Sequence, residues 1–245
     1  MTKAEIQFVR SLADKRNRDE HRCFIAEGDK LIGEILDSNL RIKHLYALEG
    51  HFAGRAETIS SKEMERISQL KTASTSLAVV EQPRHSTPVS APSDKLSLAL
   101  DGVQNPGNLG TIIRLADWFG ISDIYCSADT ADCYNPKVVQ ATMGAILRVK
   151  IHYLPLADFL KTTAANKIPV YGTMLDGENI YQSELTPAGV IVMGNEGKGV
   201  SDECAHSFTH RLLIPSYPPE RQGSESLNVA MATGIVCSEF RRRMP

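Results

Sequence analysis

The order of apolar and polar residues changes along the chain and predicts alternating strands and helices in its second half. Short, continuous apolar runs are typical of buried parallel strands, and they occur at 96–100, 124–126, 149–153, 170–174, 190–193 and 211–214. Segments with helical spacing of apolar residues lie between or after them, at 111–119, 135–147, 156–163 and 227–243. This pattern predicts an α/β fold whose parallel sheet is covered by helices on both faces.

The first part of the chain predicts a smaller α/β unit. Its expected strands are 23–26, 42–48 and 77–80, and its expected helices are 6–12, 29–36 and 60–70. Residues 82–93 then contain three prolines and few apolar side chains, which favours a linker. We therefore predict a first domain at 1–82, a linker at 83–94 and a second domain at 95–245.

Composition and charge exclude several classes of protein. No apolar run is long enough to cross a bilayer, and the polar N-terminus lacks the apolar core of a signal peptide. The five cysteines include no C-x-x-C pair, which argues against zinc and disulfides and for a reducing compartment. We expect a cytoplasmic protein without a membrane segment. A net charge of −2 neither indicates nor excludes nucleic-acid binding, because a local basic patch is sufficient.

The common nucleotide and metal motifs are absent. No G-x-G-x-x-G follows a strand, and the loop from Gly194 to Gly199 has glycine after Lys198, where a phosphate-binding loop needs Ser or Thr. The histidines are scattered, and none has metal-ligand spacing. We expect no metal site and no hydrolysis of ATP or GTP.

Three loops at expected strand ends are the candidates for chemistry. They are 101–110, 194–201 and 214–228, and each contains glycine where the backbone must turn sharply or approach a ligand. In open parallel sheets, ligands bind beyond the carboxyl ends of the strands. In the third loop, Asn228 is a poor residue for the first turn of a core helix unless its amide has a partner. Ser224 or Ser226 is the expected cap of that helix.

Charged residues in two places allow two interpretations each. Arg114 lies in an otherwise apolar helix one turn after the first loop. It either projects over a site or forms an ion pair, with Asp117 or at the edge of the sheet. Near the N-terminus, basic residues alternate with acidic ones, which is compatible with either RNA binding or a solvated helix face. The basic residues of this cluster that we assign to RNA binding are Lys15, Arg16, Arg18 and Arg22.

Together the three loops resemble the motifs of the SpoU (TrmH-type) RNA ribose methyltransferases of the SPOUT superfamily. The matching stretches are Asn108 to Arg114, Val192 to Ser201, and Ile214-Pro215 followed by Ser226 to Ala230. The stretch from Arg22 to Gly28 resembles the substrate-binding domain that often precedes this enzyme. The loop 216–222, with Pro218, Pro219, Glu220 and Arg221, is longer than the family pattern.

The resemblance implies a deep trefoil knot in the second domain, a homodimer, and S-adenosylmethionine bound largely by backbone groups. The implied cofactor-binding residues are Met193, Gly194, Gly199, Ile214 and Leu227. The implied reaction transfers a methyl group to a ribose 2′-hydroxyl, and the implied catalytic residues are Asn108, Arg114, Glu196, Ser226 and Asn228. Because a guanidinium is almost never neutral, we expect Arg114 to stabilise charge. Glu196 is expected to be either the base or an orienting acceptor.

Three alternatives stay open. One is a 2′-O-methyltransferase acting on transfer RNA, although the N-terminal domain favours ribosomal RNA. The second is a methyltransferase acting on a base nitrogen. The third is a non-catalytic RNA-binding or ribosome-assembly protein on the same fold. The retained Asn108, Arg114, Glu196 and Asn228 argue against this third alternative.

Overall fold

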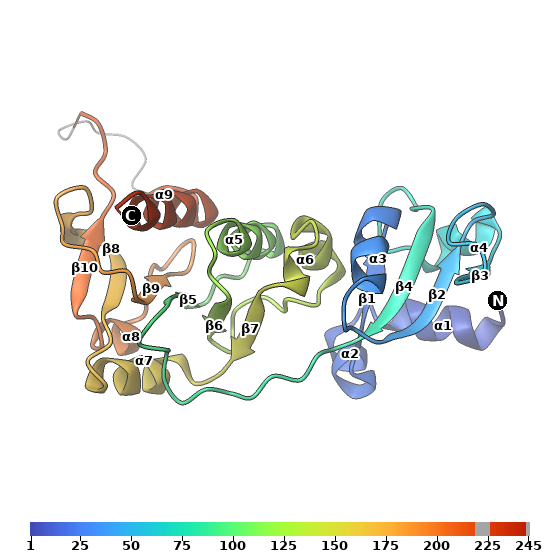
Figure 1. Ribbon diagram of the computed structural model, residues 1–245, viewed down its shortest axis with the longest axis horizontal. Coiled ribbons are helices and arrows are strands. Elements are labelled where there is room, and N and C mark those ends of the chain that lie inside the picture. Colours follow the sequence, from blue (N-terminus) through green and yellow to red (C-terminus); the bar gives the residue numbers. More distant parts are fainter. Residues whose placement is uncertain (219–225, 244–245) are drawn as a thin grey trace. The chain divides into compact units, whose positions relative to one another are not determined.

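The computed structural model describes residues 1–218 and 226–243, and its chain divides into two compact units (Figure 1). Unit 1 contains Met1–Arg84 and Asp132–Leu147, and unit 2 contains His85–Ala131 and Arg148–Pro245. The segment 132–147 therefore packs with the N-terminal residues. Part of the expected linker packs with unit 2, because Ala91 is buried there and its N–H donates to the Thr163 hydroxyl at 3.1 Å.

Unit 1 is built on a four-stranded sheet of order β1-β4-β2-β3. Its strands are β1 (Cys23–Glu27), β2 (Ile42–Ala47), β3 (Glu57–Thr58) and β4 (Ser76–Glu81). Only the β2–β3 pair is parallel. The helices are α1 (Lys3–Ser11), α2 (Lys15–His21), α3 (Asp29–Leu36), α4 (Ser61–Ile67) and α6 (Pro136–Ala141), with a 3₁₀ turn at Ala145–Leu147.

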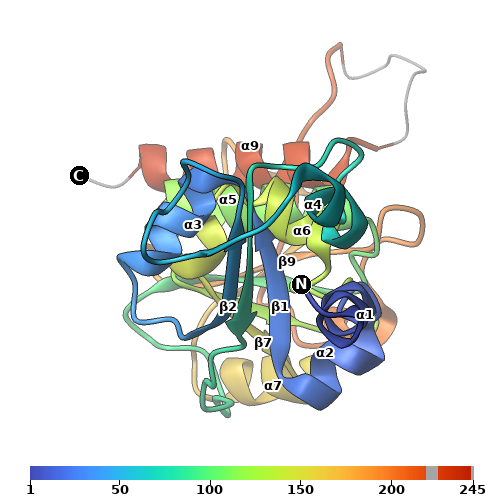
Figure 2. The same ribbon diagram turned by 90° about the vertical axis from the view of Figure 1, so that its right-hand side faces the viewer.

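Both faces of this sheet are covered. Alternate strand residues point to opposite faces, and Cys23 and Ile25 share a core with residues of α1 and α4. On β1, the intervening residue Phe24 stacks on Tyr134 with ring centroids 4.9 Å apart, in the segment that leads into α6. Helix α3 packs on β1 and β4, and Figure 2 shows it across the sheet from α1 and α4.

Unit 2 is built on six parallel strands of order β10-β8-β9-β5-β6-β7. They are β5 (Leu96–Leu100), β6 (Asp123–Cys126), β7 (Lys150–Tyr153), β8 (Val170–Asn179), β9 (Gly189–Met193) and β10 (His210–Leu213). Every strand predicted in the second domain is present, and the α/β class with a parallel sheet is confirmed. The knot stays a prediction.

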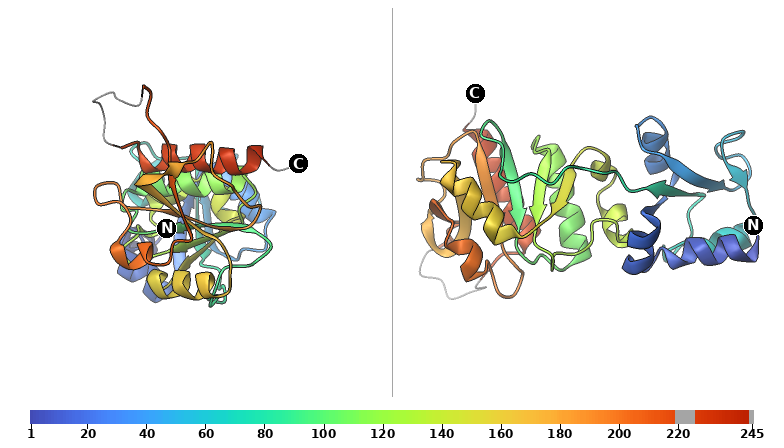
Figure 3. Two further views of the ribbon diagram at one scale, coloured as in Figure 1. Left: turned by 90° about the vertical axis from the view of Figure 1, so that its left-hand side faces the viewer. Right: turned by 90° about the horizontal axis from the view of Figure 1, so that it is seen from below.

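Helices cover the two faces of this sheet in pairs (Figure 3, left). Helices α5 (Pro106–Trp118) and α9 (Val229–Arg242) pack against each other on one face. Helices α7 (Leu156–Ala165) and α8 (Asp202–Ala205) lie on the other face, where Phe159, Leu160 and Cys204 share a core with Val190 and Val192. No helix in the described residues is long and apolar enough to span a membrane.

Three predicted helices differ in their bounds. Helix α5 begins at Pro106, capped by Asn105, so the supposed loop residues Asn108 and Gly110 lie in its first turns. The predicted helix 135–147 is α6 followed by a turn, because Met143 and Gly144 adopt φ of 51° and 92° and interrupt it. Helix α9 begins at Val229 and is capped by Asn228. The expectation of Ser226 as the cap is therefore wrong, and Ser224 lies outside the described residues.

Candidate active site

The first two loops leave the carboxyl ends of β5 and β9, which are neighbours in the sheet of unit 2. They are joined at their bases by a buried carboxylate. Asp101 Oδ2 accepts hydrogen bonds from the Ser201 backbone N–H and from its hydroxyl, both at 2.7 Å. Asn195 Nδ2 adds a bond of 2.6 Å to the Gly102 carbonyl. The start and the end of the second loop are thus fixed to the residues that follow β5.

The second loop is itself a closed turn. Asn195 and Gly199 exchange two backbone hydrogen bonds of 2.8 and 3.0 Å. Inside the turn, Asn195 Oδ1 accepts bonds from the N–H groups of Gly197 and Lys198. A Cβ placed on Gly194 would lie 2.3 Å from backbone atoms of Gly199 and Val200, closer than side chains are found to approach. Gly199 has φ of 71°, which favours glycine.

Three predicted catalytic residues from three different motifs form one hydrogen-bonded chain. The Asn228 amide donates to Asn108 Oδ1 at 3.0 Å, and the Asn108 amide donates to Glu196 Oε1 at 2.9 Å. Glu196 also accepts bonds from the backbone N–H groups of Gln104 and Asn105 at 3.3 and 3.2 Å. Asn228 Oδ1 in turn caps α9. The amide of Asn228 therefore has the partner that its position requires.

The environment of Glu196 keeps its carboxylate ionised. Partial burial raises the pKa of this group, but hydrogen bonds from Asn108 and from backbone N–H groups outweigh it, and the pKa lies below the usual value. A carboxylate with a lowered pKa is a weak base at neutral pH. This favours the orienting role of Glu196 over the role of base.

Arg114 is exposed on α5 and makes no hydrogen bond or ion pair with any described residue. The alternative partner considered for it, Asp117, is bound by Arg148, whose Nε lies 2.9 Å from Asp117 Oδ2. The alternative interpretation, in which Arg114 pairs with Asp117, is therefore not supported. Since no described residue accepts a hydrogen bond from its guanidinium, its five N–H donors can bind a ligand.

The predicted cofactor-binding residues provide backbone and apolar groups. Met193 is buried at the end of β9, Ile214 is half-buried, and Leu227 is 53% exposed. Neither Ile214 nor Leu227 forms a backbone hydrogen bond with another described residue. Such neutral donors, acceptors and apolar side chains fit an adenosine group better than a free phosphate. Ser226 is exposed and has no hydrogen-bond partner among the described residues, and loop residues Pro219, Glu220 and Arg221 lie outside them.

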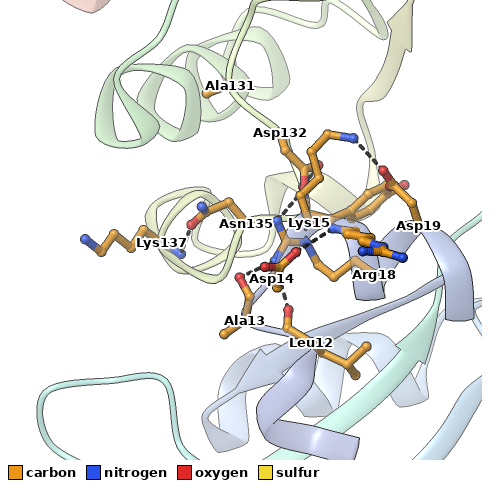
Figure 4. Close-up of polar contacts among 12 residues, drawn as sticks. Leu12, Ala13, Asp14, Lys15, Arg18, Asp19, Ala131, Asp132, Asn135 and Lys137 are labelled. Atoms are coloured by element: carbon orange, nitrogen blue, oxygen red, sulfur yellow. Dashed lines mark hydrogen bonds and ion pairs between the residues drawn. The ribbon is translucent and has the colours of Figure 1, made fainter.

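The predicted RNA-binding residues divide into two groups. Lys15, Arg16 and Arg22 are exposed. Arg18, by contrast, is 1% exposed, and its guanidinium donates to Asp132 Oδ2 at 2.6 and 3.0 Å and to the carbonyls of Leu12 and Ala13 (Figure 4). This guanidinium is buried and uses four of its five N–H donors within unit 1, so it is not accessible to a phosphate and the assignment of Arg18 to RNA binding is withdrawn.

Sequence reasoning missed four residues that shape the site, namely Asp101, Asn105, Asn195 and Ser201. Signals for two of them were present. Asp101 immediately follows the apolar strand 96–100. Asn105 also stands directly before Pro106, an arrangement typical of a helix start. Asn195 and Ser201 carry no comparable local signal, because their roles depend on contacts with the first loop.

The fold, the loops and the hydrogen-bonded chain agree with the comparison with protein families. The SpoU rRNA methylase family matches residues 95–238, and the MRM3-like substrate binding domain matches residues 3–85. The chain belongs to the SpoU rRNA methylase family.

Full-length relatives support this assignment. The 23S rRNA (guanosine(2553)-2′-O)-methyltransferase RlmP of Bacillus subtilis is 29% identical over 240 residues, which cover 95% of this chain and 94% of that protein. A structure from Porphyromonas gingivalis, assigned to the TrmH family, is 39% identical with a TM-score of 0.88 and covers 100% and 99% of the two chains. An AdoMet-bound rRNA methyltransferase from Sinorhizobium meliloti is 31% identical with a TM-score of 0.87 and covers 100% and 97%.

Proposed function

We propose that this protein transfers a methyl group from S-adenosylmethionine to a ribose 2′-hydroxyl of ribosomal RNA. The observation that carries the proposal is the hydrogen-bonded chain Glu196–Asn108–Asn228, together with an exposed Arg114 that lies on the same helix as Asn108 and has no partner among the described residues. Relatives that match the whole chain support the substrate class, since the Bacillus subtilis protein is named as a 23S rRNA 2′-O-methyltransferase.

The residues of unit 2 fit the cofactor, and other residues of this unit are assigned to the ribose and to the transfer step. When bound, S-adenosylmethionine supplies an electrophilic methyl group. We assign its adenosine to the backbone of Gly194, Ile214 and Leu227, where the closed turn leaves no space for a side chain at Gly194. The chain must then position the ribose and remove the hydroxyl proton.

Arg114 is assigned to the RNA phosphate and to the developing alkoxide. Its exposed guanidinium has no partner in the part of the chain that the structure describes and can donate two parallel hydrogen bonds to phosphate oxygens. Its fixed positive charge stabilises oxygen as it becomes negative. Asn108 and Asn228 hold the first and third loops at fixed distances from Glu196. We assign Ser226, which lies two residues before Asn228, to the ribose or to Arg114.

Methyl transfer tests this function directly. Purified protein should bind S-adenosylmethionine in calorimetry and should label ribosomal RNA with tritiated methyl groups. The labelled nucleotide should resist alkaline cleavage on its 3′ side, because a 2′-O-methyl group removes the nucleophile. Alkali-sensitive linkage at the label would indicate a base nitrogen, and cofactor binding without transfer to any RNA would indicate a non-catalytic protein. Preferred labelling of transfer RNA would overturn the ribosomal assignment.

We further infer a homodimer formed through α5 and α9. These helices pack side by side, and each has a large apolar side chain in solvent, Trp118 at 84% and Met231 at 64% exposure. Such side chains on neighbouring helices are typical of an interaction surface. Light scattering should give twice the chain mass for the wild type and the monomer mass for Trp118→Glu. The proposed location is the cytoplasm, since all five cysteines are free and buried.

A further inference from the structure

A cluster of aromatic and basic side chains in unit 1 has no role in the proposed methyl transfer. Its centre is the ring of Phe8 on α1, which is half-buried against the core of unit 1. The His21 ring meets it edge to face, with centroids 5.1 Å apart, and the His44 ring lies 6.1 Å away at 69°. Lys43 Nζ lies 5.4 Å from the centroid of Phe8. Side chains from α1, α2 and β2 thus converge on one ring.

An irregularity in β2 makes this convergence possible. In a regular strand, Lys43 and His44 would point to opposite faces of the sheet. The register of β2 against β4 shifts between Ile42 and His44, so that Lys43 is an extra residue without its own partner on β4. Bulges of this kind redirect a side chain and are common beside functional sites. Here both neighbours reach the same phenylalanine.

The cluster packs against the core through Tyr46, and two of its side chains are exposed to solvent. His44 stacks parallel on Tyr46, with centroids 6.0 Å apart and planes 7° apart, and Tyr46 is 1% exposed in the core. His21 and Lys43 are exposed, as is Arg22, which follows His21 in the chain. The nearby carboxylate of Glu5 is engaged in the capping box of α1, where it accepts the Thr2 N–H at 2.5 Å.

We propose that Phe8, His21, His44 and Lys43 form a stacking site for an unpaired base of the RNA substrate. The proposal rests on the RNA-methylating function and specifies that unit 1 recognises single-stranded nucleotides. Bases inside a duplex offer no free face, whereas unpaired bases stack on aromatic and histidine side chains. A lysine beside the ring supplies the charge that a phosphate of the same strand needs. Arg16 and Arg22 are exposed and add positive charge in the same unit, whereas Lys15 is paired with Asp19 at 2.6 Å.

Binding of labelled RNA by the full-length protein tests the stacking role. The probes are a short single strand, the same strand with its bases removed, and a hairpin duplex with the same number of nucleotides. Phe8→Leu keeps an apolar side chain against the core but removes the aromatic face. It should weaken binding of the base-bearing strand about tenfold or more and leave the base-free strand and the duplex unchanged. Phe8→Tyr should bind like the wild type.

Matched variants separate stacking from general effects of mutation. Phe52→Leu changes another half-buried phenylalanine of unit 1, one with no ring or cation contact among the described residues, and should leave binding of all three probes unchanged. Lys43→Gln should lower the slope of log affinity against log salt by about one for single strands. Lys62→Gln, an exposed lysine on α4, is the corresponding control.

These outcomes test the stacking site separately from the proposed methyl transfer. Equal weakening of all three probes by Phe8→Leu, or unchanged binding of the base-bearing strand, would overturn the stacking site even if the wild type methylates RNA. Selective weakening of the base-bearing strand would support the site even in a protein that fails to transfer methyl groups. Circular dichroism of each variant confirms that unit 1 is folded in every comparison.

Discussion

Arg114 can act in one of two ways, either as a charge that stabilises the transition state or as the base that removes the hydroxyl proton. It is exposed, and it is unpaired among the described residues. If its charge acts on the transition state, Arg114→Ala should lower the single-turnover rate of methyl transfer about a hundredfold or more. The affinity for S-adenosylmethionine should change little, because the side chain does not hold the cofactor. Rapid-quench assays and calorimetry measure the two quantities.

Two further variants make the test of Arg114 specific. Arg114→Lys keeps the charge but loses the planar fork, so it should remain slow at every pH if the fork binds a phosphate. Rescue by lysine that increases with pH would instead assign the role of base to this position. Lys161→Ala removes an exposed charge from α7 in the same unit and should retain the wild-type rate.

Glu196 allows a prediction about pH. Its pKa is lowered by hydrogen bonds that outweigh the effect of burial, so the carboxylate is ionised in the whole neutral range and has little tendency to accept a proton. Glu196→Gln keeps an oxygen acceptor for the backbone N–H groups of the first loop. We therefore expect a rate loss of about tenfold, the cost of weakening one charged hydrogen bond, with a pH–rate profile parallel to that of the wild type.

The alternative role of Glu196, that of the base, predicts a different result. A base at this position would make Glu196→Gln slower by about a hundredfold or more, and the acid limb of the wild-type pH–rate profile would vanish. Glu203→Gln, an exposed carboxylate on α8, controls for the change in net charge.

At the scale of elements, we predict that the second loop requires glycine at position 194 but not at position 197. A methyl group at Gly194 would lie 2.3 Å from backbone atoms of the same loop, whereas the nearest atom to a methyl group at Gly197 is 3.7 Å away. Gly194→Ala should force the closed turn to open and reduce cofactor affinity at least tenfold. Gly197→Ala should bind normally. Calorimetry with S-adenosylmethionine compares them, and equal affinities would show that the turn does not shape the cofactor site.

Elements were predictable from the sequence where local pattern decides them. Apolar runs predicted every strand of unit 2. The reason is clearest for β5 and β9, which are buried throughout and need continuous apolar residues, whereas the edge strands β7 and β10 are only partly buried. Helix starts were less accurate: Asn105-Pro106-Gly107 has the composition of a turn, yet Asn105 caps α5. The chain Glu196–Asn108–Asn228 was not predictable, since its bonds join residues 88 and 120 positions apart. The resemblance to the SpoU family identified these three residues as parts of the site but did not predict the hydrogen bonds between them.

At the scale of the whole molecule, the main difference concerns the segment 132–147. The sequence-based division placed it in the second domain, whereas in the structure it belongs to unit 1. Its pattern indicated a helix but could not indicate which unit the helix packs on. The deciding contacts are distant in sequence: Tyr134 stacks on Phe24, and Asp132 binds Arg18 across 114 positions. A part of the chain that lies within the methylase family match is therefore predicted to stabilise the N-terminal unit.

Asp132 tests that assignment. Its side chain is 12% exposed and that of Arg18 is 2% exposed, so Asp132→Ala leaves a buried guanidinium without its counter-charge. Loss of one partner of a buried ion pair typically costs about 3–5 kcal/mol. Arg18→Met together with Asp132→Ala should recover much of this loss, because it removes the unpaired charge. Asp94→Ala, at an exposed site, should have no effect.

Calorimetry and hydrogen exchange show where the stability of the Asp132 variant is lost. We expect a lower transition temperature and reduced amide protection in α1, α2 and β1, because Arg18 also donates to the carbonyls of Leu12 and Ala13. Protection in β5 and β9 should stay at the wild-type level, since these strands belong to the other unit. Loss of protection confined to β5 and β9 would instead mean that residues 132–147 stabilise the methylase sheet, as their position in the chain alone had predicted.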